Sequence, residues 1–140
     1  MCIFAIEKLE AVRTTGKVHF FKLVKNGKCL FDDFYNAILK DERHKKDILG
    51  ILSTMDYMAE TNALLPKEKY NSIKQGKNVI GYEFKKKDLR VYCVKPLENI
   101  VVIFGGYKKK QKDDIKRFER FVEETKGIIE ELIVKNLKAL

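Results

Sequence analysis

The residues best suited to chemistry in this sequence are cations that gather around three short apolar runs in its C-terminal half. They are interleaved with tyrosines: Lys85, Lys86, Lys87 and Arg90 lie near Tyr82 and Tyr92, and Lys108, Lys109, Lys110 and Lys112 follow Tyr107. Guanidinium and ammonium groups beside aromatic rings can bind phosphates while the rings stack on bases. The pattern indicates a nucleic-acid interface. The alternative is an ordinary solvated surface, because Lys-rich hairpin loops are common in soluble proteins.

The charge of the chain favours a polyanionic partner. The formal net charge is +9, and residues 66–126 carry 17 Lys and Arg against 9 Asp and Glu, a net of +8. The rest of the chain is therefore nearly neutral. An excess confined to one segment is what a binding face requires, and it fits either a nucleic acid or an acidic protein.

The sequence carries no familiar catalytic or metal-binding signature. The serine-hydrolase, zinc-protease and Walker glycine-loop motifs are all missing from it. Cys2, Cys29 and Cys93 are odd in number and lack C-x-x-C spacing, so we expect no disulfide framework and no zinc site, with Cys93 as a buried thiol. We expect no metal and no cofactor. We also expect ordinary structural or surface roles for His19 and His44.

Hydropathy along the chain favours a cytoplasmic protein. The apolar opening at residues 1–6 is interrupted by Glu7 and Lys8, too early for the core of a secretory leader. No later run approaches the roughly 20 apolar residues that a membrane span requires. We therefore expect no membrane partner.

The secondary-structure elements that must position the cations follow an α+β order. We expect a single domain, residues 1–140, because this length is enough to bury one hydrophobic core. Runs rich in β-branched and aromatic residues predict four strands, at residues 18–24, 79–84, 89–94 and 100–104. Helical spacing of apolar residues predicts three helices, at residues 31–39, 44–59 and 115–133, the last weakened at Gly127. Residues 3–9 could form either a strand or one helical turn.

The spacers between the last three strands determine how these strands pair. Residues 85–88 and 96–99 are too few for a parallel crossover, so we expect an antiparallel meander that joins the N-terminal strand in one antiparallel sheet. The two N-terminal helices and the long C-terminal helix would cover one face and leave the other available. Arg90 and Tyr92 would share a face of their strand, because side chains alternate along it.

Three strings in the cationic half carry a family resemblance. They are GYEFK at residues 81–85, LRVY at 89–92 and VVIFGGYKKKQK at 101–112. They resemble the RelE/HigB superfamily of toxin–antitoxin systems, in particular its phage-related HigB-like branch. The resemblance implies a RelE-like fold and a type II toxin that cleaves mRNA without a metal, free or on the ribosome. It also implies a cognate antitoxin protein as a partner.

The sequence departs from the family pattern at two positions of this segment. Gly105 stands where many HigB-like sequences have a histidine. Glu83 stands where RelE has one of its active-site lysines.

By the same resemblance, Arg90 takes the place of the strand arginine that contacts the scissile phosphate, and Lys85 and Lys108 fall at basic positions of the active site. Metal-free RNA cleavage uses the 2′-OH as nucleophile. Lys85 is our candidate general base, because neighbouring cations disfavour the charged form of a lysine. Lys108 would stabilise charge or protonate the leaving oxygen. The remaining candidates would bind RNA: Lys86, Lys87, Tyr92, Tyr107, Lys109, Lys110 and Lys112.

Two alternatives stay open. Arg90 could instead form a salt bridge with Glu83 or Asp88 across the hairpin. The chain could also be a non-enzymatic binder: a ParE-like gyrase poison, a protein that only occupies RNA or an antitoxin, or a regulatory nucleic-acid-binding module.

Overall fold

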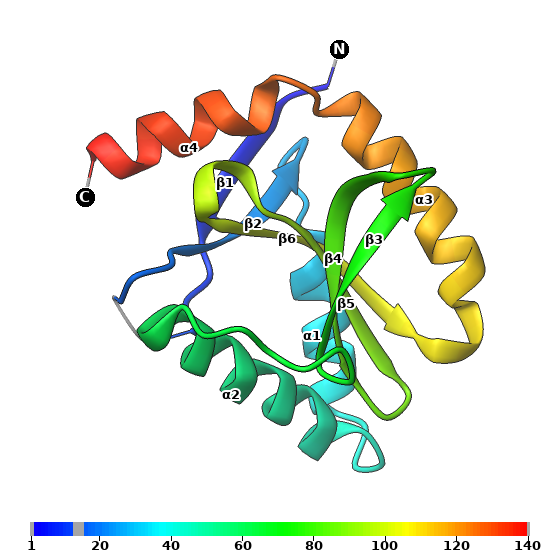
Figure 1. Ribbon diagram of the computed structural model, residues 1–140. Helices are drawn as coiled ribbons and strands as arrows, with labels where there is room; N and C mark the ends of the chain where they lie inside the picture. Colours follow the sequence, from blue (N-terminus) through cyan, green and yellow to red (C-terminus); the bar gives the residue numbers. More distant parts are fainter. Residues whose placement is uncertain (1, 13–15, 140) are drawn as a thin grey trace.

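A six-stranded sheet organises the fold, with its strands in the order β1-β2-β6-β5-β4-β3 (Figure 1). The computed structural model describes residues 2–12 and 16–139. Its strands are β1 (Phe4–Lys8), β2 (Phe20–Lys25), β3 (Tyr70–Gln75), β4 (Asn78–Lys86), β5 (Leu89–Val94) and β6 (Ile100–Tyr107). Its helices are α1 (Leu30–Leu39), α2 (Lys45–Thr61), α3 (Gln111–Glu124) and α4 (Ile128–Lys138), with short 3-10 turns η1 (Pro96–Glu98) and η2 (Lys108–Lys110). The α+β class expected from the sequence is confirmed.

The three strands of the cationic half pair antiparallel in chain order, β4 with β5 and β5 with β6. The turn between β4 and β5 consists of Lys87 and Asp88, and Lys87 lies in the left-handed region at φ 50°. Across the strands, Arg90 lies opposite Gly106. The β4–β5 turn and the end of β6 are therefore neighbours.

The sheet is larger and less uniform than the expected antiparallel sheet of one N-terminal strand and a meander. β2 pairs with β6 in parallel, which corrects that expectation. Residues 3–9, left open between strand and helical turn, contain the edge strand β1. β3 is not predicted from the sequence, because the run YNSIKQ has a single buried residue, Ile73. Such a polar edge strand discourages pairing with other chains.

Helices cover both faces of the sheet, which corrects the expectation of one open face (Figure 1). α1 and α2 pack on one face, around a core that includes Met55. α3 and α4 pack on the opposite face, around a core that includes Phe118. Because side chains alternate along β5, Val91 joins the first core and Tyr92 the second.

The expected long C-terminal helix is two helices. α3 ends at Glu124, and α4 begins at Ile128, directly after Gly127. Gly127 has a φ of 78°, a left-handed conformation that glycine adopts without steric cost. The break lets α4 leave the direction of α3 and pack near β1.

Candidate functional site

A pocket of about 450 Å³ forms where the start of α2, the β4–β5 turn and the end of β6 meet. Its lining consists of one imidazole, one phenol, one carboxylate and three cations: Arg43, His44, Asp88, Tyr107, Lys108 and Lys109. The backbone N–H of Lys108 donates to the Asp88 carbonyl at 2.7 Å, which joins two of the three walls. The pocket therefore combines a proton-transfer group with an excess of positive charge.

His44 is oriented by a carboxylate on its own turn. Its Nδ1 lies 2.7 Å from Asp41 Oδ2, and because a carboxylate only accepts hydrogen bonds, Nδ1–H is the donor. This bond holds the pKa of Asp41 below its usual value. Nε2 is then the free ring nitrogen, 3.8 Å from the largely exposed carboxylate of Asp88. A histidine fixed in one tautomer by a carboxylate is a suitable general base.

Local backbone structure holds this pair in place. His44 is the N-cap of α2, and both its own N–H and that of Lys45 donate to the Asp41 carbonyl, at 3.0 and 2.9 Å. The His44 ring packs edge-on against Tyr107 at a centroid distance of 5.4 Å, and only 9% of the residue is exposed. The imidazole is therefore held in place from two sides.

Sequence reasoning missed His44 as a functional residue. The available signal was the Asp-x-x-His spacing of Asp41 and His44 immediately before a helix, which places the two side chains on one turn. Nothing in the sequence indicates that the end of β6, more than sixty residues later, meets that turn.

The structure distributes the predicted site residues over two cavities and places outside both. Tyr107, Lys108 and Lys109 line the His44 pocket. Lys85, Lys86 and Lys87 line a separate groove of about 760 Å³ beside α2, which we call the α2 groove. The other two predicted RNA-binding lysines are exposed near the start of α3: Lys110 and Lys112.

Arg90 and Tyr92 lie on the opposite face of the sheet, beneath α3. Arg90 is 7% exposed, and its Nη1 donates to the carbonyls of Lys87 and Leu89, both at 2.8 Å. Among the described residues Arg90 forms no ion pair, so the alternative of a salt bridge to Glu83 or Asp88 is wrong. In this conformation the guanidinium holds the β4–β5 turn, which carries Asp88 into the His44 pocket.

Tyr92 belongs to the core, which corrects its assignment as a base-stacking residue. The residue is fully buried, with its ring 5.0 Å from that of Phe104 and 6.1 Å from that of Phe118. Burial raises the pKa of Tyr92 well above its usual value. Its hydroxyl has no hydrogen-bond partner among the described residues.

Tyr92→Phe should increase the free energy of unfolding by about 1 kcal/mol, because an unpaired buried hydroxyl carries a desolvation cost of about 1–3 kcal/mol. A urea titration measures this as a higher midpoint with an unchanged m-value. Tyr57→Phe, at a residue that is 53% exposed, is the matched control and should leave the midpoint unchanged. A lower midpoint for Tyr92→Phe would show that the hydroxyl makes a stabilising bond in solution.

The two departures from the family pattern have structural counterparts. Glu83 is 4% exposed and accepts a 2.7 Å bond from Gln111, so it ties the first residue of α3 to β4. A Cβ atom at Gly105 would overlap the ring of Phe34 in α1, so a histidine does not fit there unless that ring moves. The imidazole beside Tyr107 is that of His44.

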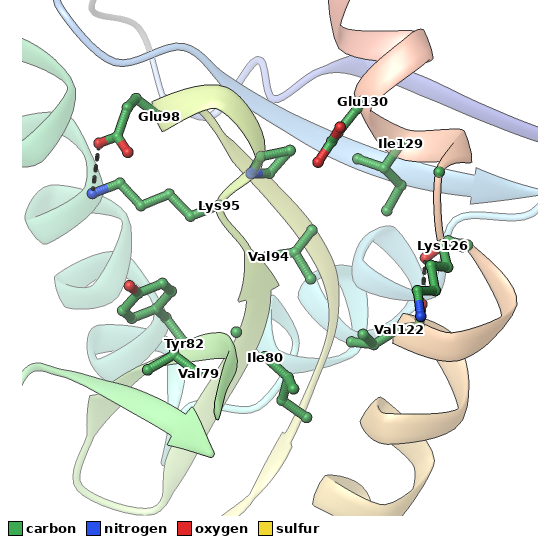
Figure 2. A pocket seen from close by; sticks show the side chains of 14 residues that line it. Val79, Ile80, Tyr82, Val94, Lys95, Glu98, Val122, Lys126, Ile129 and Glu130 are labelled. Carbon is green, nitrogen blue, oxygen red and sulfur yellow. Dashed lines mark hydrogen bonds and ion pairs between the residues drawn. The ribbon is translucent and has the colours of Figure 1, made fainter. Parts of the chain in front are cut away.

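A third cavity, of about 400 Å³, lies where the start of β4 and the end of β5 approach the α3–α4 junction (Figure 2). Figure 2 shows Lys95 and Glu98 pointing toward each other, with their charged atoms 3.5 Å apart. Lys126 and Glu130 supply the other two charges of its lining. Because these charges balance, this cavity is less suited to a polyanion than the other two.

Cys93 is buried and free, as expected, and its burial raises the pKa of the thiol. The described residues include no group of three or more His, Cys, Asp or Glu side chains suited to a metal ion. Across residues 2–12 and 16–139, no helix has both the length and the apolar character needed to cross a bilayer.

Comparison with protein-family models, curated proteins and solved structures finds no match for the chain.

Proposed function

We propose that this protein is an endoribonuclease that needs no metal and acts as the toxin of a type II toxin–antitoxin pair in the cytoplasm. The observation that carries the proposal is the His44 imidazole, oriented by Asp41 in a pocket that also contains Lys108 and Lys109. An oriented imidazole can act as general base in the transfer of an RNA phosphoryl group, and neighbouring cations can stabilise the charge that develops. The resemblance of residues 81–112 to the RelE/HigB superfamily supports the same reaction.

The reaction begins when Nε2 of His44 takes the proton of the ribose 2′-OH. The 2′-oxygen forms a bond to phosphorus, the P–O5′ bond breaks, and an ammonium group, Lys108 in our assignment, gives its proton to the leaving oxygen. The products are a 2′,3′-cyclic phosphate and a 5′-OH. Arg43 and Lys109 stabilise the negative charge of the phosphorane, and Asp41 stabilises the imidazolium that forms.

This assignment changes two of the roles expected from the resemblance. Lys85 lines the α2 groove, so the imidazole of His44 replaces it as general base. Arg90 is a positioning residue in this proposal, because it bonds to the carbonyls on both sides of Asp88. Lys108 keeps its expected role.

The second candidate is a non-enzymatic binder of RelE/ParE type that occupies gyrase, nucleic acid or an antitoxin. The burial of Arg90 and Tyr92 favours it, because the strand arginine that the family directs at the phosphate points here into the protein. In either case the charge of residues 66–126 suits an antitoxin with an acidic segment as the natural partner.

Incubation of the purified chain with an end-labelled single-stranded RNA should give fragments that end in a 2′,3′-cyclic phosphate, in EDTA as well as in magnesium. The matched control is the same sequence made as DNA, which has no 2′-OH and should remain intact. The assay is run with free RNA and with mRNA on translating ribosomes. Intact RNA in both arms, together with measurable RNA binding, would reject cleavage and favour the binder.

A further inference from the structure

The α2 groove is a second polar concavity, next to the His44 pocket. α2 supplies one wall, the chain leading into β3 supplies another, and the end of β4 with its turn closes the third side. Its lining residues from α2 carry small or hydroxyl-bearing side chains and one aromatic ring: Gly50, Ser53, Thr54 and Tyr57. At about 760 Å³ it has room for a nucleotide-sized group.

Positive charge dominates this groove. Four lysines line it against the single carboxylate of Glu68: Lys69, Lys85, Lys86 and Lys87. Across the described part of the chain, no carboxylate forms an ion pair with any of these four. Four unneutralised ammonium groups around one concavity favour a ligand with several negative charges.

Glycine at position 50 makes room for one of these lysines. A Cβ atom there would lie 2.6 Å from Lys86 Nζ and 2.7 Å from its Cδ, so the Lys86 side chain extends over the bare backbone of α2. This contact brings the ammonium group onto the wall of the groove.

The groove also exposes an aromatic and an aliphatic surface. Tyr57 is 53% exposed and Leu64 is fully exposed, and both line the groove. Exposed aromatic rings beside lysines are the usual means of binding single-stranded nucleic acids, because bases stack on the rings while phosphates pair with the cations. An acidic peptide would use the lysines but would gain less from an exposed tyrosine ring.

The groove and the His44 pocket share two structural elements. Lys87 lines the groove and Asp88, the next residue, lines the pocket, so the β4–β5 turn separates the two. His44 caps the same helix that carries Gly50, about 9 Å further along at 1.5 Å per residue. A flexible single-stranded nucleic acid bound in the α2 groove can therefore extend into the His44 pocket.

From this arrangement we infer that the α2 groove is an RNA subsite, which holds the nucleotides adjacent to the bond cleaved beside His44. This inference rests on the proposed function, because the proposed cleavage of RNA is what identifies RNA as the ligand. Phosphates contact Lys69 and Lys86, and a base stacks on Tyr57. The groove thus determines how the strand is aligned in the His44 pocket.

The test measures binding of a 12-nucleotide oligouridine whose 2′-oxygens are methylated, so that it cannot be cleaved, by fluorescence anisotropy over a series of salt concentrations. Lys69→Gln with Lys86→Gln should lower the slope of log affinity against log salt by about 1.4, since each phosphate contact on a single strand contributes about 0.7. Tyr57→Ala should weaken binding about tenfold through loss of one stacked base, and Tyr57→Phe should retain the affinity.

The charge-matched control is Lys74→Gln with Lys77→Gln, two exposed lysines at the β3–β4 turn. Neither lysine lines the groove: Lys74 is five residues along β3 from Lys69, about 17 Å at 3.3 Å per residue, and Lys77 is further away, so the slope should not change. Thermal melts establish that each variant is folded.

The outcomes separate the subsite from the cleavage proposal. Groove variants that bind like the control variant overturn the subsite, even if the wild type cleaves RNA. Groove-dependent binding by a wild type that leaves unmethylated RNA intact supports the subsite and rejects cleavage. Groove variants that keep their RNA affinity but lose binding to a Glu-rich peptide assign the groove to an acidic protein, and overturn the inference.

Discussion

His44→Ala should lower the rate of RNA cleavage by about 10²- to 10⁴-fold, the usual contribution of a positioned general base. The variant should bind uncleavable RNA nearly as well as the wild type, because the cations that line the pocket remain. The measurement is single-turnover cleavage of an end-labelled RNA, combined with anisotropy on its 2′-O-methylated counterpart. The loss should therefore appear in the rate of the chemical step and not in affinity.

His19→Ala is the matched control. His19 is the only other histidine of the chain, directly precedes β2 and does not line the His44 pocket. Asp41→Asn supplies a further comparison. It removes the carboxylate that fixes the ring tautomer while keeping the imidazole, so its rate should fall between those of the wild type and His44→Ala. If His44→Ala cleaves as fast as the wild type, the catalytic group lies elsewhere.

Phe118→Ala should reduce the free energy of unfolding by about 3–5 kcal/mol, the range for removal of a buried phenylalanine ring. Phe118 is completely buried between α3 and the sheet. Its ring lies against Tyr92 and directly over Gly81. Loss of the ring leaves a cavity between α3 and the sheet. Urea unfolding of the two proteins measures the difference.

Phe4→Ala is the control for this experiment, because Phe4 is a partly buried phenylalanine of the edge strand β1 and should cost clearly less. Gly81→Ala tests the same contact from the other side. A Cβ atom there would overlap the Phe118 ring, so the variant should also be destabilised, by overpacking. A loss below about 1 kcal/mol for Phe118→Ala would mean that α3 is not held by this contact.

The residues of the stability predictions and those of the RNA predictions lie on different faces of the sheet. Phe118 and Tyr92 lie under α3, whereas His44 and the α2 groove lie on the side of α1 and α2. Tyr92→Phe should therefore retain the cleavage rate of the wild type. This separation allows loss of fold and loss of chemistry to be distinguished in the same set of proteins.

Local patterns in the sequence were sufficient to predict most of the elements. The spacing of apolar residues predicts α1 and α2 close to their observed bounds, because an amphipathic helix repeats every 3.6 residues regardless of its surroundings. The runs over β4, β5 and β6 predict three strands, and their short spacers predict the antiparallel pairing. The excess of positive charge and the buried thiol of Cys93 also follow from the sequence alone.

Contacts between segments distant in the sequence determined the features that local patterns did not predict. β3 has too few apolar residues to be recognised, and it forms because β4 supplies a partner for its backbone. The second face is covered because of the direction in which α3 leaves β6, and the break at Gly127 then brings α4 to β1; neither is a periodic feature of the sequence. Spacing also predicted that the cations would converge, whereas the β4–β5 turn separates Lys85, Lys86 and Lys87 from Lys108 and Lys109, and the other cations lie outside both sites.

His44, the candidate catalytic residue, shows most clearly which features the sequence determines and which depend on tertiary contacts. The sequence determines that Asp41 and His44 share a turn at the start of a helix, because three residues span about one helical turn. It does not determine that Tyr107, Lys108 and Lys109 meet that turn, because this proximity arises from the position of β6 within the sheet and from the packing of α1 and α2 against it. The family resemblance implied that Arg90 is a phosphate ligand, but in the structure it is buried and bonds to the β4–β5 turn, because α3 covers its face of the sheet.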